Sequence, residues 1–308
     1  MTRLETALGD YLQLRRALGH KLDNTGRQLA RFVEYLDDMG EETVTMRSAL
    51  AFVLDPDLDP AGSVPAHRLT AVRGFARHLA GSDARTEIPP TGVVRYRARR
   101  RTPYLFSDDD VTAVVHCARA STPSPFRAET LTTLIGLLAA TGMRVGEAIR
   151  LDYSEIDWDD AVILVRDTKF HKGRNVAVSD STIDALRAYA RQRDRLRPST
   201  TRFFTSLCGT PVAYSHFGST FRNAVIAAGI GASSPVQPHI HDLRHSFAVR
   251  TLLRWYRAGL DVDVLLPRLS TYLGHREPRF TYWYLTATPE LLGHAAARLE
   301  AAYKTVPR

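Results

Sequence analysis

Hydrophobic residues in the first 80 positions of the chain recur with the spacing of amphipathic helices. They do so first at Leu12, Leu14, Leu18 and Leu22, and then at Leu29, Phe32, Val33 and Leu36. Gly40 ends the second of these helices, and two more are expected over Met46–Leu54 and Pro65–Ala80, the last one stopped by Gly81. The pattern predicts a small, all-helical domain over residues 1–84.

The pattern after residue 104 predicts a second domain, mainly α with a small antiparallel β-sheet. Ser107 is a candidate N-cap for an apolar helix through Val111–Cys117, and another helix passes through Leu131–Ala140. Alternation typical of strands follows in three short runs, Glu155–Trp158, Ala161–Arg166 and Arg174–Val178. The pattern then stays helical to the end, so we expect residues 104–308 to form one domain.

Residues 85–103 differ from both flanking regions and are predicted to form a basic linker. Pro89, Pro90 and Gly92 interrupt regular structure. Five arginines follow within seven positions, at Arg95, Arg97, Arg99, Arg100 and Arg101. Such a run is typical of a segment that contacts DNA phosphates. The alternative is a solvated charge run without a ligand.

Composition narrows the class of protein. The 308 residues carry 41 Lys and Arg against 33 Asp and Glu, a net charge of +8, which favours a polyanionic partner such as double-stranded DNA. No run of about 18 apolar residues offers a membrane span, and the N-terminus lacks the pattern of a signal peptide. Cys117 and Cys208 lie far apart and outside any metal-ligand spacing, which indicates a cytoplasmic protein with reduced thiols.

Candidate chemistry is concentrated in four segments of the second domain. They are Thr141–Glu147 (TGMRVGE), Thr168–Arg174 (TKFHKGR), His241–His245 (HDLRH), and Leu273–His275 (LGH) with Tyr284 nine residues after the histidine. Arg144 opens a helix after a Thr-Gly break, and Arg244 shares a helix face with His241. Two guanidinium groups suit the two non-bridging oxygens of a phosphodiester, because arginine stays charged and donates in pairs.

In this order and at these distances, the four segments resemble the tyrosine recombinase (phage integrase) family, which includes the lambda-type integrases, the Xer recombinases and Cre. The resemblance covers the whole second domain, roughly residues 104–308. It implies a C-terminal catalytic domain preceded by an N-terminal helical core-binding domain, and the first domain matches the latter in type and place. Each motif alone is weak, but the ordered set is specific.

The resemblance also implies a role for each site residue. The spacing selects Tyr284 as the nucleophile over Tyr282, although Leu285 and Thr286 depart from the polar residue that many members have after the tyrosine. Arg144, Arg244 and His275 would stabilise the transition state, and Glu147 would orient Arg144. Lys169 matches the position of the general acid, with two nearby alternatives that are also candidate DNA contacts, Lys172 and Arg174.

A tyrosine hydroxyl has a pKa near 10 and needs a base or a cationic site to attack at neutral pH. His241 is expected to act as acid and base for this proton. The resemblance implies a 3′-phosphotyrosine and a free 5′-hydroxyl, so the bond energy is kept and no cofactor is needed. A homotetramer would act on two duplexes through a Holliday junction, from a monomer or weak dimer when free.

Other classes stay open on the sequence alone. A type IB topoisomerase uses a similar residue set. A non-catalytic DNA-binding regulator is the second alternative, but it would lack the tyrosine or an arginine, and this chain has both. His239, His241 and His245 could also suggest a metal, but a zinc site needs further ligands that the sequence does not supply in register. We therefore expect no metal. The C-terminal helix, with Leu291 and Leu299 on its apolar face, could pack on its own domain or on a neighbouring protomer.

Overall fold

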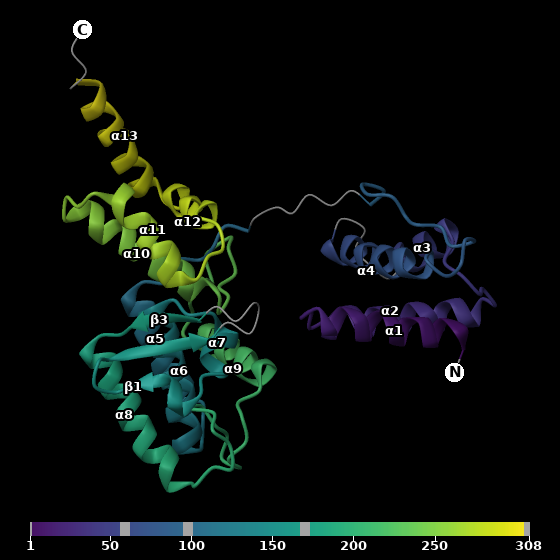
Figure 1. The fold of residues 1–308 in the computed structure, drawn as a ribbon. Coiled ribbons are helices and arrows are strands. Elements are labelled where there is room, and N and C mark those ends of the chain that lie inside the picture. Colours follow the sequence, from purple (N-terminus) through teal and green to yellow (C-terminus); the bar gives the residue numbers. More distant parts are fainter. Residues whose placement is uncertain (1, 56–61, 95–100, 167–172, 305–308) are drawn as a thin grey trace. The chain divides into compact units, whose positions relative to one another are not determined.

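The structure, a computed structural model, describes residues 2–55, 62–94, 101–166 and 173–304. The chain divides into two compact units, Met1–Arg100 and Arg101–Arg308 (Figure 1). The boundary falls inside the segment that was expected to be a linker. In the described residues, no helix is long and apolar enough to cross a bilayer.

The first unit is built from four helices, α1 (Arg3–Ala17), α2 (Asp23–Asp38), α3 (Met46–Val53) and α4 (Ser63–Leu79). Capping boxes begin α1 at Thr2 and α3 at Thr45, which satisfies amide groups that the first helical turn leaves unpaired. The predicted face of α2 is confirmed, because its four residues are almost fully buried: Leu29, Phe32, Val33 and Leu36.

The face predicted for the first helix is wrong at two positions, although Leu12 packs against the core. Leu14 and Leu18 are 51% and 64% exposed, whereas Leu4, Leu8 and Tyr11 enter the core. These three residues repeat at the three-to-four spacing of one helix face. Some leucines near the end of α1 face solvent. A prediction based on the leucines alone therefore placed the buried face of the helix too close to its C-terminal end.

The first part of the expected linker belongs to the first unit. Arg73 of α4 donates hydrogen bonds to the carbonyl oxygens of Pro89 and Pro90, at 2.7 and 2.8 Å. The amide of Glu87 donates to the carbonyl of Val44 at 2.8 Å. The backbone at 87–90 is therefore held against the first unit by hydrogen bonds from the Arg73 side chain and to the Val44 carbonyl.

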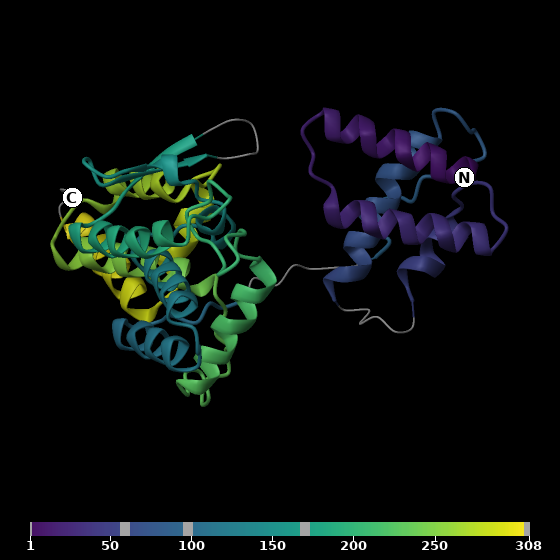
Figure 2. The same ribbon diagram turned by 90° about the horizontal axis from the view of Figure 1, so that it is seen from below.

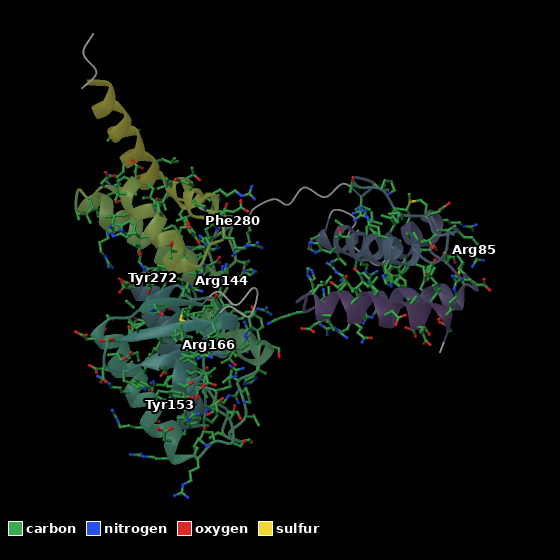
Figure 3. All side chains as sticks on the ribbon, in the orientation of Figure 1. Arg85, Arg144, Tyr153, Arg166, Tyr272 and Phe280 are labelled. Atoms are coloured by element: carbon green, nitrogen blue, oxygen red, sulfur yellow. The ribbon has the colours of Figure 1, made fainter. Side chains whose placement is uncertain are left out.

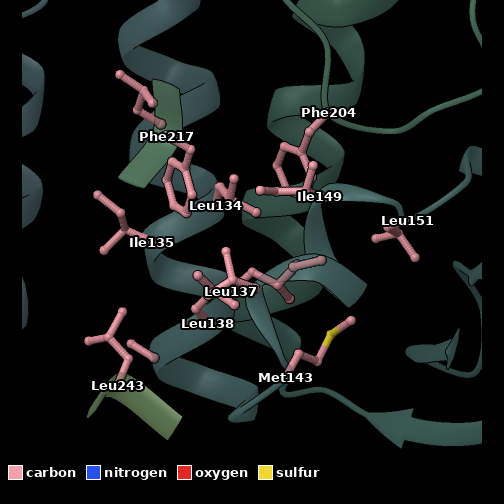
Figure 4. Packing of buried hydrophobic residues seen from close by; sticks show 14 of the residues in the cluster. Leu134, Ile135, Leu137, Leu138, Met143, Ile149, Leu151, Phe204, Phe217 and Leu243 are labelled. Atoms are coloured by element: carbon pink, nitrogen blue, oxygen red, sulfur yellow. The ribbon is translucent and has the colours of Figure 1, made fainter. Parts of the chain in front are cut away.

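The core of the second unit surrounds α6 (Pro125–Thr141), which is apolar on almost every side. A helix of this kind is stable only when neighbours cover all of its faces. Figure 4 shows its residues Leu134, Ile135, Leu137 and Leu138 inside this cluster. The cluster also takes residues from α5 (Asp108–Ala120), α7 (Val145–Ile149), α8 (Asp180–Arg195) and α9 (Tyr214–Ala227). The predicted N-cap of α5 is confirmed, since the Ser107 side chain accepts from the amide of Asp110.

A three-stranded antiparallel sheet runs in the order β1 (Ile156–Asp157), β2 (Val162–Arg166), β3 (Gly173–Ala177), which confirms the predicted small sheet. The pairs Ile163–Val176 and Val165–Arg174 fix the register of β2 on β3. Side chains two residues apart share a face of a strand. Arg174 therefore points to the same face as Val176, which is buried.

The remaining helices form a second cluster in the same unit (Figures 1 and 2). They are α10 (Asp242–Arg257), α11 (Val262–Leu273), α12 (Arg279–Tyr282) with the 3-10 turn η2 (Trp283–Thr286), and α13 (Pro289–Lys304). Leu252, Leu266, Leu269 and Tyr284 meet in this cluster, and Leu291 of α13 is buried with them. At Leu291, the C-terminal helix packs on its own unit.

Candidate active site

Two helix ends bring the predicted site residues together. α6 ends at Gly142 with a φ of 62°, as the Thr-Gly break predicted, and α11 ends at Gly274 with a φ of 69°. Glycine is favoured at both positions because residues with a side chain rarely adopt this left-handed backbone conformation. A Cβ at Gly142 would also lie 2.6 Å from the ring of Phe247.

The two arginines are fixed by the backbone at these helix ends. Arg244 donates to the carbonyl oxygens of Gly142 and Leu273, at 2.8 and 2.6 Å. Arg144 donates to the carbonyl of Gly274 at 2.7 Å, so both guanidinium groups bridge α6 or α7 to the end of α11. Figure 3 shows Arg144 where α10–α12 meet the part of the unit that contains the sheet.

Glu147 lies between two arginines. Its carboxylate accepts from Arg144 at 2.6 Å and from Arg174 at 2.7 Å. Burial alone would raise the pKa of Glu147, but the hydrogen bonds and charges of Arg174 and Arg144 outweigh it and lower this pKa to about 2. The guanidinium group of Arg144 is therefore held between the carboxylate of Glu147 and the carbonyl oxygen of Gly274.

Arg174 was expected to contact DNA, but its side chain lies mostly buried beside Glu147. Its side chain is 11% exposed, pairs with Glu147 and donates to the carbonyl of Tyr272 at 2.8 Å. The direction of β3 explains this, since Arg174 shares the inner face of the strand with Val176. Arg174 supports the carboxylate that holds Arg144.

Tyr284 lies on η2 and is 2% exposed. Its hydroxyl lies 3.1 Å from Nδ1 of His245, and its ring stacks on His275 with 6.1 Å between ring centres. Tyr282 is 52% exposed. Of the two candidate tyrosines, Tyr284 is the one whose hydroxyl lies among the site histidines.

Three histidines share this site, and their positive forms are disfavoured there. Burial, and next the charge of Arg244, lowers the pKa of His241 and that of His275, the latter to about 3. Burial and His241 lower the pKa of His245 to about 4. Burial and Arg144 also lower the pKa of Arg244, but only to about 10. At neutral pH the arginines thus carry the positive charge of the site, and the histidines are neutral.

His275 is held by the segment that carries the tyrosine. Its Nδ1 lies 2.7 Å from the hydroxyl oxygen of Thr281, a fully buried residue of α12. Thr281 precedes Tyr284 by three residues, so one short segment contacts the histidine and supplies the tyrosine. His241 is the residue immediately before α10, with its ring 5.0 Å from that of His245.

Several predicted residues are not placed in this site. Lys169 and Lys172 lie outside the described residues, as do Arg95, Arg97, Arg99 and Arg100. Arg101 is described and forms an ion pair of 2.5 Å with Asp242, which is 1% exposed. It also donates to the carbonyl of Gln237 at 2.6 Å, so Arg101 anchors the chain to the second unit at the start of α10.

Sequence reasoning missed the contacts of Thr281 and His245. His245 was considered as part of a possible metal site, and Thr281 was not considered. His245 lies four residues after His241, and Thr281 lies three residues before Tyr284. This spacing of one helical turn from a predicted site residue is the signal that could have found them. Over the described ranges, no three His, Cys, Asp or Glu side chains form a group suited to a metal ion.

Comparison with known proteins places the chain in a family. Residues 106–290 match the model of the phage integrase family. The chain is 38% identical over 315 residues to y4rB of Sinorhizobium fredii, a protein named as an integrase/recombinase, with 99% of each chain covered.

Two solved structures share the fold. One is the XerH site-specific recombinase bound to palindromic difH substrate in a post-cleavage complex, with a TM-score of 0.66, 19% identity, and coverage of 90% of this chain and 79% of that one. The other is a lambda integrase tetramer bound to a Holliday junction, with a TM-score of 0.58, 16% identity, and coverage of 91% and 76%.

Proposed function

Because the chain belongs to the phage integrase family of tyrosine recombinases and is a site-specific recombinase, we propose that it cleaves and rejoins DNA through a 3′-phosphotyrosine at Tyr284. The observation that carries this proposal is the convergence of Arg144, Arg244 and His275 with the Tyr284 hydroxyl in one site. Phosphoryl transfer needs a nucleophile beside groups that stabilise negative charge on the non-bridging oxygens.

Arg144 and Arg244 supply that stabilisation. Their anchors at Gly142, Leu273 and Gly274 are neutral carbonyl oxygens, so the guanidinium groups are oriented in advance. Oriented donors need no rearrangement as negative charge develops in the transition state. His275 adds a neutral donor next to them.

The Tyr284 hydroxyl attacks phosphorus and the bond to the sugar 5′-oxygen breaks. His241 takes the phenol proton once the hydroxyl leaves His245, and it returns this proton when the strand is rejoined. Lys169 gives a proton to the leaving 5′-oxygen, because an alkoxide is a poor leaving group and a lysine is protonated at neutral pH. No external energy source is needed, since the phosphotyrosine keeps the energy of the phosphodiester.

The partner in this proposal is double-stranded DNA at specific recombination sites. A homotetramer would hold two duplexes and pass through a Holliday junction, as the lambda integrase tetramer in the comparison is bound to one. The first unit would act as the core-binding domain, and the basic run at 95–100, with Lys172, would contact phosphates.

The test begins with selection of a DNA site. The Tyr284→Phe variant, which is expected to bind without cleaving, is used to select sites from fragments flanking the gene and from a random-sequence library. A nicked suicide duplex with the selected site is then incubated with the wild-type chain. We expect a covalent protein–DNA adduct with the wild type and with Tyr282→Phe, and none with Tyr284→Phe.

An adduct that persists in Tyr284→Phe and disappears when Tyr282 is also replaced would move the nucleophile to Tyr282. Absence of any adduct with the wild type on a bound site would contradict the proposed catalysis. A plasmid with two sites separates recombinase from topoisomerase, because only a recombinase yields exchanged products rather than relaxed circles alone.

A further inference from the structure

Thr281 places a buried hydroxyl against the proposed phosphate-binding histidine. The residue is 0% exposed, and its Oγ1 lies 2.7 Å from Nδ1 of His275. Other helical threonines of this unit, Thr251 and Thr271, donate to the carbonyl oxygen four residues earlier. Thr281 instead directs its hydroxyl to an imidazole ring outside its own helix.

The direction of this hydrogen bond fixes which ring nitrogen of His275 carries the proton. Burial and the nearby arginine charges keep His275 neutral at physiological pH, so one nitrogen has a hydrogen and the other has a lone pair. With Nδ1 occupied by Thr281, Nε2 is the nitrogen left to face a substrate. A phosphate oxygen requires Nε2–H, since a lone pair there would repel it.

The buried environment favours donation by the threonine. If the Thr281 hydroxyl accepted a hydrogen from Nδ1, its own hydrogen would need a second acceptor inside the protein, and a buried donor without an acceptor costs free energy. Donation from Oγ1–H to the Nδ1 lone pair satisfies both atoms. It also leaves the ring proton on Nε2.

We propose that the Thr281 hydroxyl, donating to Nδ1, holds His275 in the Nε2–H tautomer and so makes it a hydrogen-bond donor to the reacting phosphate. Thr281 is thus a positioning residue that acts through His275. This inference rests on the proposed function, in which His275 contacts the phosphate. It adds that the segment carrying Tyr284 also sets the state of a transition-state donor.

The direct test does not use DNA. The full chain is labelled with 15N-histidine, and two-bond 1H–15N correlation spectra at pH 7 report the tautomer of each imidazole, with His275→Gln identifying the signals of His275. We expect the Nε2–H pattern for His275 in the wild type and in Thr281→Ser, which keeps a hydroxyl. In Thr281→Val, which has the same shape without the hydroxyl, we expect a mixture of tautomers.

The second readout is the rate of adduct formation on the suicide duplex. Loss of a partner that orients a metal-bound histidine typically costs about 10–100-fold, and we expect a loss of similar size for Thr281→Val. Thr281→Ser should stay within about threefold of the wild type, because the hydroxyl is restored. Thr281→Val combined with His275→Ala should be no slower than His275→Ala alone, since the threonine acts only through the histidine.

The outcomes separate this inference from the proposed function. An Nδ1–H pattern for wild-type His275 overturns the inference even if neither Thr281 variant folds. Equal losses of rate in Thr281→Ser and Thr281→Val also overturn it, and cleavage by the wild type would still stand. A wild type that forms no adduct contradicts the proposed function, while the spectra still decide the tautomer.

Discussion

Replacing Glu147 with glutamine removes a negative charge that lies between two guanidinium groups. The carboxylate is 10% exposed and accepts from Arg144 and Arg174, which lower its pKa from the ordinary 4.5 to about 2. At about 1.36 kcal/mol per pH unit, this difference corresponds to about 3 kcal/mol of folding free energy at neutral pH. Glutamine keeps an acceptor oxygen, so we expect Glu147→Gln to lower the free energy of unfolding by about 2–4 kcal/mol.

The loss of folding free energy in Glu147→Gln should become smaller as the pH falls. Because the folded-state pKa is lowered, the stabilisation is fully present above pH 4.5 and is lost as the pH falls towards 2. The difference between wild type and Glu147→Gln should narrow from about 3 kcal/mol at pH 7 to about 1 kcal/mol at pH 3. All three tryptophans, Trp158, Trp255 and Trp283, lie in the second unit, so tryptophan fluorescence during urea unfolding reports on this unit alone.

A matched control is Glu290→Gln, which removes an ion pair of 2.8 Å with Arg257 between side chains that are 45% and 63% exposed. Exposed pairs contribute about 0–1 kcal/mol, so this variant should stay close to the wild type. If Glu147→Gln cost no more than Glu290→Gln at pH 7, or if its cost were the same at pH 3, the charge of Glu147 would not stabilise the site.

The other predictions concern groups that contact DNA. Lys169→Ala should cleave ordinary DNA very slowly but cleave a 5′-bridging phosphorothiolate at nearly the wild-type rate, because a thiolate leaves without a proton. Arg244→Ala should lose about 10²–10³ in cleavage rate on both substrates. If the phosphorothiolate substrate rescued Lys172→Ala but not Lys169→Ala, Lys172 would be the general acid. Glutamine in place of the arginines at 95, 97, 99 and 100 should weaken binding to all DNA sequences alike. The slope of log K against log salt concentration should also become flatter, by about 0.9 per lost phosphate contact. An unchanged slope would mean that this run is merely solvated.

The sequence predicted the elements that depend on local pattern. The helices of both units, the sheet and the break at Gly142 follow from hydrophobic spacing, caps and glycine. These features are encoded within a few residues of chain, so a single sequence is enough to find them. The family resemblance added the order of the motifs, which periodicity alone does not supply.

Contacts between distant segments were harder to predict. Arg174 was expected at DNA because it follows a basic turn, but the register of β3 on β2 turns it towards Glu147. Arg101 was counted with the linker arginines, but Asp242, 141 residues later in the chain, holds it. The charge of an arginine is visible in a sequence, whereas the carboxylate that it meets depends on tertiary packing.

The carbonyl anchors of the two arginines also bear on how this site tolerates mutation. Every residue type has a backbone carbonyl, so no side-chain substitution at Leu273 can delete the acceptor that Arg244 uses there. Gly142 and Gly274 are exceptions for another reason, because a Cβ would lie 2.6 Å from Phe247 at the first and 2.8 Å from the Arg174 guanidinium at the second. Among these backbone anchors, random mutagenesis should therefore find Gly142 and Gly274 vulnerable, because a side chain does not fit there.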